Sequence, residues 1–254
     1  MADDDKIRLD HRLYDLLKQH GGVVLGENHY DPSVIQSVTM LLPALKAHGM
    51  GTISMELPQA MVDKLHALPD VKAVQDYYPR LDTTDAEALH GLAVACRRCD
   101  VKFIGHEKYE GLHMLAQMPR DDKRHDEQAM AYYNKLSPVQ TMNERNLFAQ
   151  HYIKKHGNGK VIAISGAEHC RSQADSRTKE NYPALSTLLG YPAITYREMT
   201  EGEAVGTTHT DPNHPQNYEM LLPADIKDAF KNALIIPSPH PQATLLPNNK
   251  GLSR

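Results

Sequence analysis

The sequence predicts an α/β fold in which a mainly parallel central sheet is flanked by helices within a single main domain. Short apolar runs of strand length alternate with amphipathic segments of helix length, a pattern typical of βαβ units. Several of these runs stop abruptly at a glycine or a polar residue, as buried parallel strands do before a turn. The chain has 254 residues and 41% apolar content, which is enough for one sizeable core.

The elements of the first half follow from residue spacing and from turn residues. Leucines between Leu9 and Leu17 fall at helical spacing, and glycines at 21 and 22 end that helix before a strand at 23–26. Pro32 suits the first turn of a helix that reaches about residue 48. A strand is expected at 53–55, and helices are expected after it and over 86–98, whereas residues 77–79 fit no element.

The second half continues the alternation. A strand is expected at 102–104, and Pro138 begins a long helix that Gly157 ends. A strand follows at 161–165, then a short helix over 182–189 and a last strand at 193–196. We divide the chain into a tag-like or disordered start at 1–8, an α/β catalytic-type domain at 9–200, and an extended accessory segment with a Pro-rich tail at 201–254.

Composition excludes several classes of protein. The net charge of −4, with scattered Lys and Arg, argues against a nucleic-acid partner. No run of eighteen apolar residues is present, and the N-terminus lacks the order of a signal peptide, so we expect a soluble chain without a transmembrane segment. The three cysteines are odd in number and have no framework spacing, which favours free thiols in a reducing compartment.

Two of the expected strands end in the same short motif. Residues 22–29 read GVVLGENH and residues 160–169 read KVIAISGAEH, so each run closes in Gly-x-x-His with a glutamate beside the histidine. Parallel strands deliver their carboxyl ends to one edge of the sheet, where α/β proteins bind ligands. If the two strands are neighbours, His29 and His169 meet in one crevice with Glu27 and Glu168 nearby.

Other polar residues fall where the fold could bring them to this edge. Glu56 follows the strand at 53–55, and His106 with Glu107 forms a third tip, which we rank below the first two. Arg145 lies on a half-apolar ridge of the helix that begins at Pro138. An arginine on such a ridge either extends its charge into solvent or meets an anion or carboxylate, and position alone does not decide between the two.

In their order along the chain, these motifs resemble the haem-uptake and Tiki superfamily. That superfamily includes Tiki-type metalloproteases, TraB-like proteins, erythromycin-esterase-like hydrolases, ChaN-like lipoproteins and a related domain of bacterial toxins and effectors. The resemblance covers residues 22–196 and is most specific in the toxin-type run GENHYDPSVIQSVTMLLPALKAHGMGTISMELP. It maps the paired Gly-x-x-His motifs to Gly26–His29 and Gly166–His169, the strand-end glutamate to Glu56 and the helical arginine to Arg145.

The resemblance implies a parallel sheet with a polar cleft over its strand ends, and a hydrolase of peptide or ester bonds is our leading hypothesis. His29, Glu56 and His169 would bind a divalent metal ion and leave a position open for water. Glu27 or Glu168 would be the general base. Arg145 would be a buried ion-pair partner of a site carboxylate, or would stabilise an oxyanion. In a metal-free variant, His29 is the base and Glu27 or Glu56 orients it.

Two other classes of function stay open. An effector module could bind a host protein through an inactive site, although the retention of both motif histidines and Glu56 argues against that. Haem binding through His or Tyr is the other alternative. No His-Glu-x-x-His helix is present, so the chain is not a standard zincin. The resemblance implies a peptide or ester substrate, which could be a host protein, and a place either in the bacterial cytoplasm or, after secretion, in a host cell.

Overall fold

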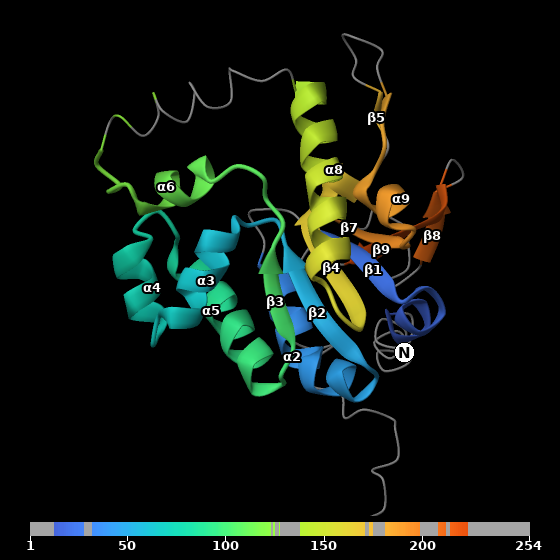
Figure 1. Cartoon of the computed structure of the whole chain (residues 1–254), viewed down its shortest axis with the longest axis horizontal. Coiled ribbons are helices and arrows are strands. Elements are labelled where there is room, and N and C mark those ends of the chain that lie inside the picture. Colours follow the sequence, from blue (N-terminus) through green and yellow to red (C-terminus); the bar gives the residue numbers. More distant parts are fainter. Residues whose placement is uncertain are drawn as a thin grey trace, which may run out of the picture.

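The computed structural model describes residues 13–27, 32–122, 124, 127, 138–170, 173–174, 181–198, 208–211 and 214–222. Its centre is a seven-stranded sheet (Figure 1). The strands of this sheet are β1 (Gly22–Glu27), β2 (Met50–Met55), β3 (Lys102–Gly105), β4 (Lys160–Gly166), β7 (Ala193–Glu198), β8 (Thr208–Asp211) and β9 (His214–Leu222).

The strand order is β3-β2-β4-β1-β7-β9-β8, and neighbouring strands pair in parallel except β8 with β9. The four strands predicted before residue 170 all belong to this sheet, which confirms the predicted fold class. β1 and β4, the strands of the two Gly-x-x-His motifs, are direct neighbours. In their register Gly26 lies opposite Ser165 and Glu27 opposite Gly166, so the two strands end level with each other.

Helices connect the strands, as the sequence predicted. Residues 13–20 are helical, and the helices that follow include a 3-10 helix, η1, directly after β4. A separate two-stranded sheet pairs β5 (Gln173–Ala174) with β6 (Asn181–Tyr182). The helices are α2 (Ser33–Ala47), α3 (Gln59–Ala67), α4 (Val71–Tyr77), α5 (Thr83–Arg98), α6 (Gly111–Gln117), α8 (Pro138–His156), η1 (Ala167–Cys170) and α9 (Leu185–Leu189).

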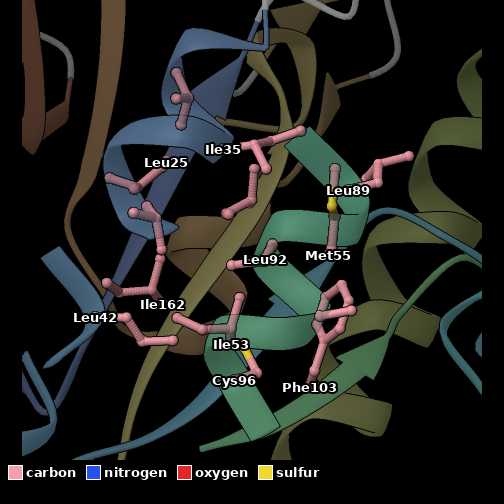
Figure 2. Close-up of a cluster of buried hydrophobic side chains, with 14 of the residues drawn as sticks. Leu25, Ile35, Leu42, Ile53, Met55, Leu89, Leu92, Cys96, Phe103 and Ile162 are labelled. Atoms are coloured by element: carbon pink, nitrogen blue, oxygen red, sulfur yellow. The ribbon is translucent and has the colours of Figure 1, made fainter. Parts of the chain in front are cut away.

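Apolar side chains cover both faces of the sheet. Leu25 and Ile162 point to one face, where they pack with residues of α2, α3 and α5 (Figure 2). The neighbouring residues Val24 and Ala163 point to the other face, where they pack with α8 residues such as Ile153. Adjacent residues of a strand face opposite sides, so a strand that is covered on both sides reads as an unbroken apolar run. Burying one such aliphatic side chain stabilises the fold by roughly 1.5–3 kcal/mol.

Local chemistry explains where several helices begin and where one ends. The side chain of Asp82 accepts a hydrogen bond from the backbone N–H of Asp85 and caps α5. Asp70 caps α4 in the same way, and α4 ends at Tyr77, the first residue of the stretch 77–79 that fitted no predicted element. Gly49 has a φ of +87°, a backbone conformation that glycine adopts without strain, and it leads from α2 into β2.

The C-terminal part of the sheet was not predicted. Thr208–Asp211 form β8, which pairs with β9, and β9 in turn pairs with β7. Both strands fall within the predicted accessory segment. Strand 208–211 has no apolar run and so carries no signal of a buried strand. Within the described ranges, no helix is long and apolar enough to span a bilayer.

Candidate active site

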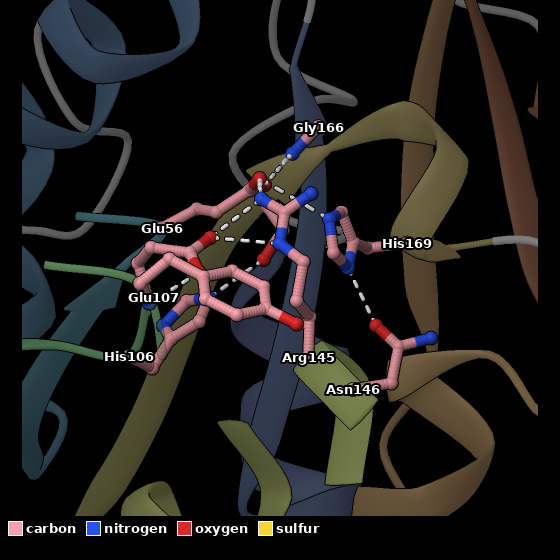
Figure 3. A network of polar contacts seen from close by, with 9 residues as sticks. Glu56, His106, Glu107, Arg145, Asn146, Gly166 and His169 are labelled. Carbon is pink, nitrogen blue, oxygen red and sulfur yellow. Dashed lines mark hydrogen bonds and ion pairs between the residues drawn. The ribbon is translucent and has the colours of Figure 1, made fainter. Parts of the chain in front are cut away.

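Polar side chains from the carboxyl-terminal ends of β2, β3 and β4 converge with Arg145 and Asn146 of α8 (Figure 3). Backbone hydrogen bonds hold these strand ends together beyond the last residue of each strand. Glu56 N–H donates to Ile164 of β4, and the N–H groups of His106 and Glu107 donate to Met55 and Leu57. The edge that the sequence predicted as the site is therefore a rigid frame.

Glu56 is at the centre of the cluster. One carboxylate oxygen, Oε2, accepts a hydrogen bond of 2.7 Å from the backbone N–H of Gly166. The other, Oε1, accepts from Nη2 of Arg145 and lies 3.1 Å from Nε2 of His169. The Glu56 side chain is only 6% exposed. Residues from three different elements therefore hold the carboxylate: Gly166 of β4, Arg145 of α8 and His169 of η1.

Arg145 joins two carboxylates, as Figure 3 shows. Its Nε lies 2.8 Å and its Nη2 lies 2.5 Å from Oε2 of Glu107, and Nη2 also donates to Glu56. Glu107 is almost fully buried, and its other oxygen accepts from the backbone N–H of Tyr109. Arg145 pairs with a site carboxylate, as predicted, although its own side chain is 19% exposed and so is only partly buried. Glu107 is a second carboxylate that the sequence did not assign to it.

The ring of His169 is fixed by Asn146, the residue after Arg145. Asn146 donates from Nδ2 to the carbonyl of Pro183 at 2.9 Å, so its Oδ1 faces Nδ1 of His169 at 2.5 Å. An amide oxygen accepts hydrogen bonds only, and Nδ1 must therefore carry a proton. The remaining ring nitrogen, Nε2, is the one that meets Glu56.

His106 is a second buried histidine, and it plays a different part. Its Nδ1 lies 2.7 Å from Oγ of Ser54 on β2, and its Nε2 lies 2.8 Å from Oγ of Ser165 on β4. Loss of solvent lowers the pKa of His106 to about 3, with smaller contributions from His169 and Arg145 in the same direction and an opposing one from Glu56. His106 is therefore a neutral bridge between two strands rather than an ionised member of the cluster.

A cavity of about 130 Å³ opens beside the cluster. Glu56 and Glu27 line it from the strand ends, and Asp85 lines it from the first turn of α5. Apolar side chains of α2, β2 and α5, including Ile35 and Leu89, form much of the remaining wall. We call it the Glu56 cavity.

The predicted site residues have different outcomes. Glu56, Arg145 and His169 meet in one network, and Glu27 is buried at the end of β1, on the cavity wall. Glu168 is exposed, although its neighbour His169 is buried, so its assignment as a base stays a prediction. His29 lies outside the described residues, and its place in the trio stays a prediction as well.

Two of the three predicted metal ligands, Glu56 and His169, belong to this cluster, and the third, His29, lies outside the described residues. Among the described residues, no group of three or more His, Cys, Asp and Glu side chains is arranged to hold a metal ion. The positive charge next to Glu56 and Glu107 is the guanidinium of Arg145, and both His169 nitrogens face protein oxygens. The described side chains thus form a site of paired charges, and a metal ion bound by His29, Glu56 and His169 stays a prediction.

Three members of the cluster were missed or ranked low. His106 and Glu107 do follow a strand, but the sequence does not say that β3 lies next to β2. Asn146 follows Arg145, so its i+1 position would be expected to point elsewhere on the helix. A signal was present in the polar pair Arg145-Asn146 within α8, because two adjacent polar residues on a covering helix can reach two neighbouring groups at a sheet edge.

Comparison with known proteins supports the fold. No protein-family model matches the chain, and no curated protein sequence matches it. Solved structures that resemble it come from bacterial toxins and effectors. The type III effector HopBA1 matches with a TM-score of 0.53 and 13% identity, over 85% of this chain and 93% of that chain.

Two further structures match over 85% of this chain. The C-terminal region of Pasteurella multocida toxin, whose structure was described as having a thiol-protease-like catalytic triad, matches with a TM-score of 0.50 and 15% identity over 26% of that chain. RRSP, a MARTX toxin effector domain from Vibrio vulnificus, matches with a TM-score of 0.49 and 14% identity over 38% of that chain. At these identities the likeness concerns the fold.

Proposed function

We propose that the chain is a hydrolase of peptide or ester bonds and that Glu56 and His169 form its proton-transfer pair. The observation that carries the proposal is the contact of 3.1 Å between Nε2 of His169 and Oε1 of Glu56, at the edge of a parallel sheet and beside a cavity. Ligands of open α/β sheets bind at this edge. A buried acid–base pair bordering a cavity is the usual setting of general acid–base catalysis.

The free-energy cost of burying these charged groups also favours a functional role. Glu56, Glu107 and His169 are all buried, and taking charged groups out of water is expensive even when they are paired. An apolar cluster at the same strand ends would stabilise the fold at least as well. Selection for stability alone gives no reason to keep these charges, whereas proton transfer requires titratable groups held in fixed positions.

The proposed chemistry follows from the fixed positions of these groups. A water molecule next to Glu56 attacks the carbonyl carbon of the substrate, and Glu56 takes the proton that the water loses. The resulting tetrahedral intermediate collapses when the bond to the leaving nitrogen or oxygen breaks, and the Glu56–His169 pair returns the proton to that atom. Arg145 and the N–H of Gly166 keep Glu56 in place, and Asn146 holds the His169 ring.

The assignments of Glu27, Glu168 and His29 belong to the same proposal. Glu27 lines the cavity together with Glu56 and is an alternative base. His29, two residues further along the sequence, is assigned as the base of a metal-free variant or as a metal ligand. A divalent metal ion would lower the pKa of bound water and polarise the carbonyl. Metal analysis of the purified protein, with hydrolysis measured before and after chelation, separates the two variants.

The biological setting is proposed from the fold. The likeness to HopBA1, at a TM-score of 0.53, supports a bacterial toxin or effector domain that acts on a host protein. Membership of the haem-uptake and Tiki superfamily is part of the proposal, supported by the convergence of Glu56, Arg145 and His169. A cavity of about 130 Å³ is well below the roughly 300–1,000 Å³ of sites for drug-sized ligands, so it gives no support to haem binding.

Libraries of peptides and esters provide the experiment. Wild-type protein should cleave members of one library, and Glu56→Gln should lose that activity while it keeps the melting temperature of a folded protein. A host-binding module with an inactive site would instead show no turnover on any library and would bind its partner equally well with Gln at position 56.

A further inference from the structure

We propose that the Glu56 cavity is a specificity pocket for a basic side chain, so that the substrate carries Lys or Arg beside the bond that is cleaved. The inference rests on the proposed function for the position of that bond. Its own basis is the combination of size, apolar wall and acidic rim that the cavity shows.

The size of the cavity fits one side chain. An engineered protein cavity of about 150 Å³ holds one benzene molecule, so a cavity of about 130 Å³ has room for a group of similar size. Its wall is mostly aliphatic, with Met55 and Leu57 at the end of β2, Leu81 before α5 and Leu89 within α5. An unbranched aliphatic stem therefore meets apolar surface along its length.

Asp85 makes the cavity selective for charge. Its carboxylate has no hydrogen-bond or ion-pair partner within the described part of the chain, although the residue is partly buried. Partial burial raises the pKa of Asp85, and the neighbouring Asp82 raises it further. A cation that enters the cavity would supply the charge partner that Asp85 lacks.

Glu56 is not available as the charge partner of a cation in the cavity. Glu56 is already paired with Arg145 and His169, whereas Asp85 lines the cavity from the first turn of α5. The ordinary role of an acid in the first turn of a helix is to interact with the helix dipole, and Asp85 has this role too. An interaction with the helix dipole does not require a cavity next to the acid. Thr83 and Thr84 in the same turn are exposed to solvent, whereas Asp85 lines the cavity.

Other occupants fit less well. An acidic side chain would meet three carboxylates, those of Glu27, Glu56 and Asp85. A purely apolar side chain would take water away from Asp85 without replacing its interactions, which carries an unfavourable desolvation cost. Lys and Arg combine an apolar stem with a charged end, and both features have a counterpart in the wall.

Binding of two small amides tests the inference without requiring turnover. The probes are the Nα-acetyl methylamides of lysine and of norleucine, which share the stem and differ in the ammonium group. Saturable shifts of the Leu81 and Leu89 methyl resonances report on binding. We expect lysine amide to bind about 10- to 100-fold more tightly than norleucine amide, the range for a charged hydrogen bond.

Asp85→Asn should remove most of that ratio. Glu87→Gln is the matched control, because Glu87 lies on the exposed side of the same helix, and it should keep the ratio. If Asp85→Asn does not fold, the salt dependence of the wild-type ratio replaces it, because added salt weakens only the charged probe. Equal binding of the two probes, an unchanged ratio in Asp85→Asn, or shifts that do not saturate would each overturn the inference.

Peptide cleavage then separates this inference from the proposed function. Cleavage next to Lys and Arg that spreads to other residues in Asp85→Asn supports both. Cleavage with no preference for basic residues supports the proposed function and rejects the pocket. Selective binding of lysine amide by a protein that cleaves nothing supports the pocket and rejects the proposed function.

Discussion

Nε2 of His169 lies 3.1 Å from Oε1 of Glu56, and the opposite ring nitrogen faces an amide oxygen whose orientation is fixed by Pro183. Two lone pairs at such a distance would repel each other. A proton therefore lies at the His169–Glu56 contact, in addition to the one on Nδ1. His169 and Glu56 therefore share one proton between the imidazole and the carboxylate. The proposed chemistry depends on this shared proton.

Removing Arg145 should strongly destabilise the protein. Arg145→Met leaves the buried carboxylates of Glu56 and Glu107 without their main counter-charge, and breaking a buried pair in this way costs about 3–5 kcal/mol. Arg145→Lys should recover only part of the loss, because an ammonium group cannot reproduce the planar fork. Urea denaturation measures the free energy of unfolding of each variant.

An exposed ion pair that includes Glu144, the residue before Arg145 in α8, provides the control for Arg145. Lys108 and Glu144 form a contact in which both side chains are well exposed, and such pairs contribute roughly 0–1 kcal/mol. Lys108→Met should therefore change stability little. Arg145→Met combined with Glu107→Gln should cost less than the sum of the two single changes. Equal costs for Lys108→Met and Arg145→Met would contradict the described network.

His106 should make the protein less stable as pH falls from neutrality. Its pKa is lowered to about 3 in the folded state, whereas an unfolded histidine titrates near 6.5, so between these values the unfolded chain binds more protons. Stability from this residue is complete above pH 6.5 and falls as pH decreases toward 3. Between pH 7 and pH 5 the loss amounts to about 2 kcal/mol.

His106→Gln should remove that part of the pH dependence, whatever its effect on stability at pH 7. The exposed His151 offers a matched control, and His151→Gln should keep the wild-type slope of unfolding free energy against pH. The measurement is a series of denaturant titrations from pH 7 to pH 5. A slope in His106→Gln equal to that of the wild type would show that His106 does not titrate in the way proposed.

Two glycines should respond in opposite ways to alanine. A Cβ at Gly105, the last residue of β3, would lie 2.3 Å from the carbonyl oxygen of Leu57, and the backbone next to Glu56 would have to move. A Cβ at Gly91, inside α5, meets only a methyl group of Thr39 at 3.9 Å. Gly105→Ala should destabilise by about 1–3 kcal/mol. Gly91→Ala should stabilise by up to about 1 kcal/mol.

Thermal or chemical unfolding of the two alanine variants checks this prediction. The Gly105 variant should also shift the resonances of His106 and His169, since it moves the strand tip that carries Glu56. A Gly105→Ala protein as stable as Gly91→Ala would mean that the ends of β2 and β3 are not packed as tightly as described.

The sequence was sufficient to predict the site wherever an apolar run leads directly to a polar residue. Glu56 and the motif histidine His169 follow such runs, and parallel pairing alone brings strand ends to one edge. The position of Arg145 came from its helical ridge and the family resemblance. The pairing of β1 with β4 could be tested only by the structure, because sequence separation says nothing about strand order.

The other parts of the site and of the sheet depend on contacts between segments that are far apart in the sequence. Whether Glu107 or another acid meets Arg145 is decided by the place of β3 beside β2, and the role of Asn146 is decided by the carbonyl of Pro183. The polar strand β8 is formed because β9 offers it an edge, not because its own sequence has a strand pattern. The local sequence pattern does not determine such long-range pairings.

Hydrolysis rates show whether Glu56 and His169 act as a proton-transfer pair. They are measured for wild type, Glu56→Gln, His169→Ala and the double variant on a substrate selected from the libraries. Each single variant should lose about 10²–10⁴-fold in rate. The double variant should be no more than a few-fold slower than the single ones, because the two residues act as one unit. Full activity in either single variant, or losses that multiply in the double variant, would contradict the proposed proton-transfer pair.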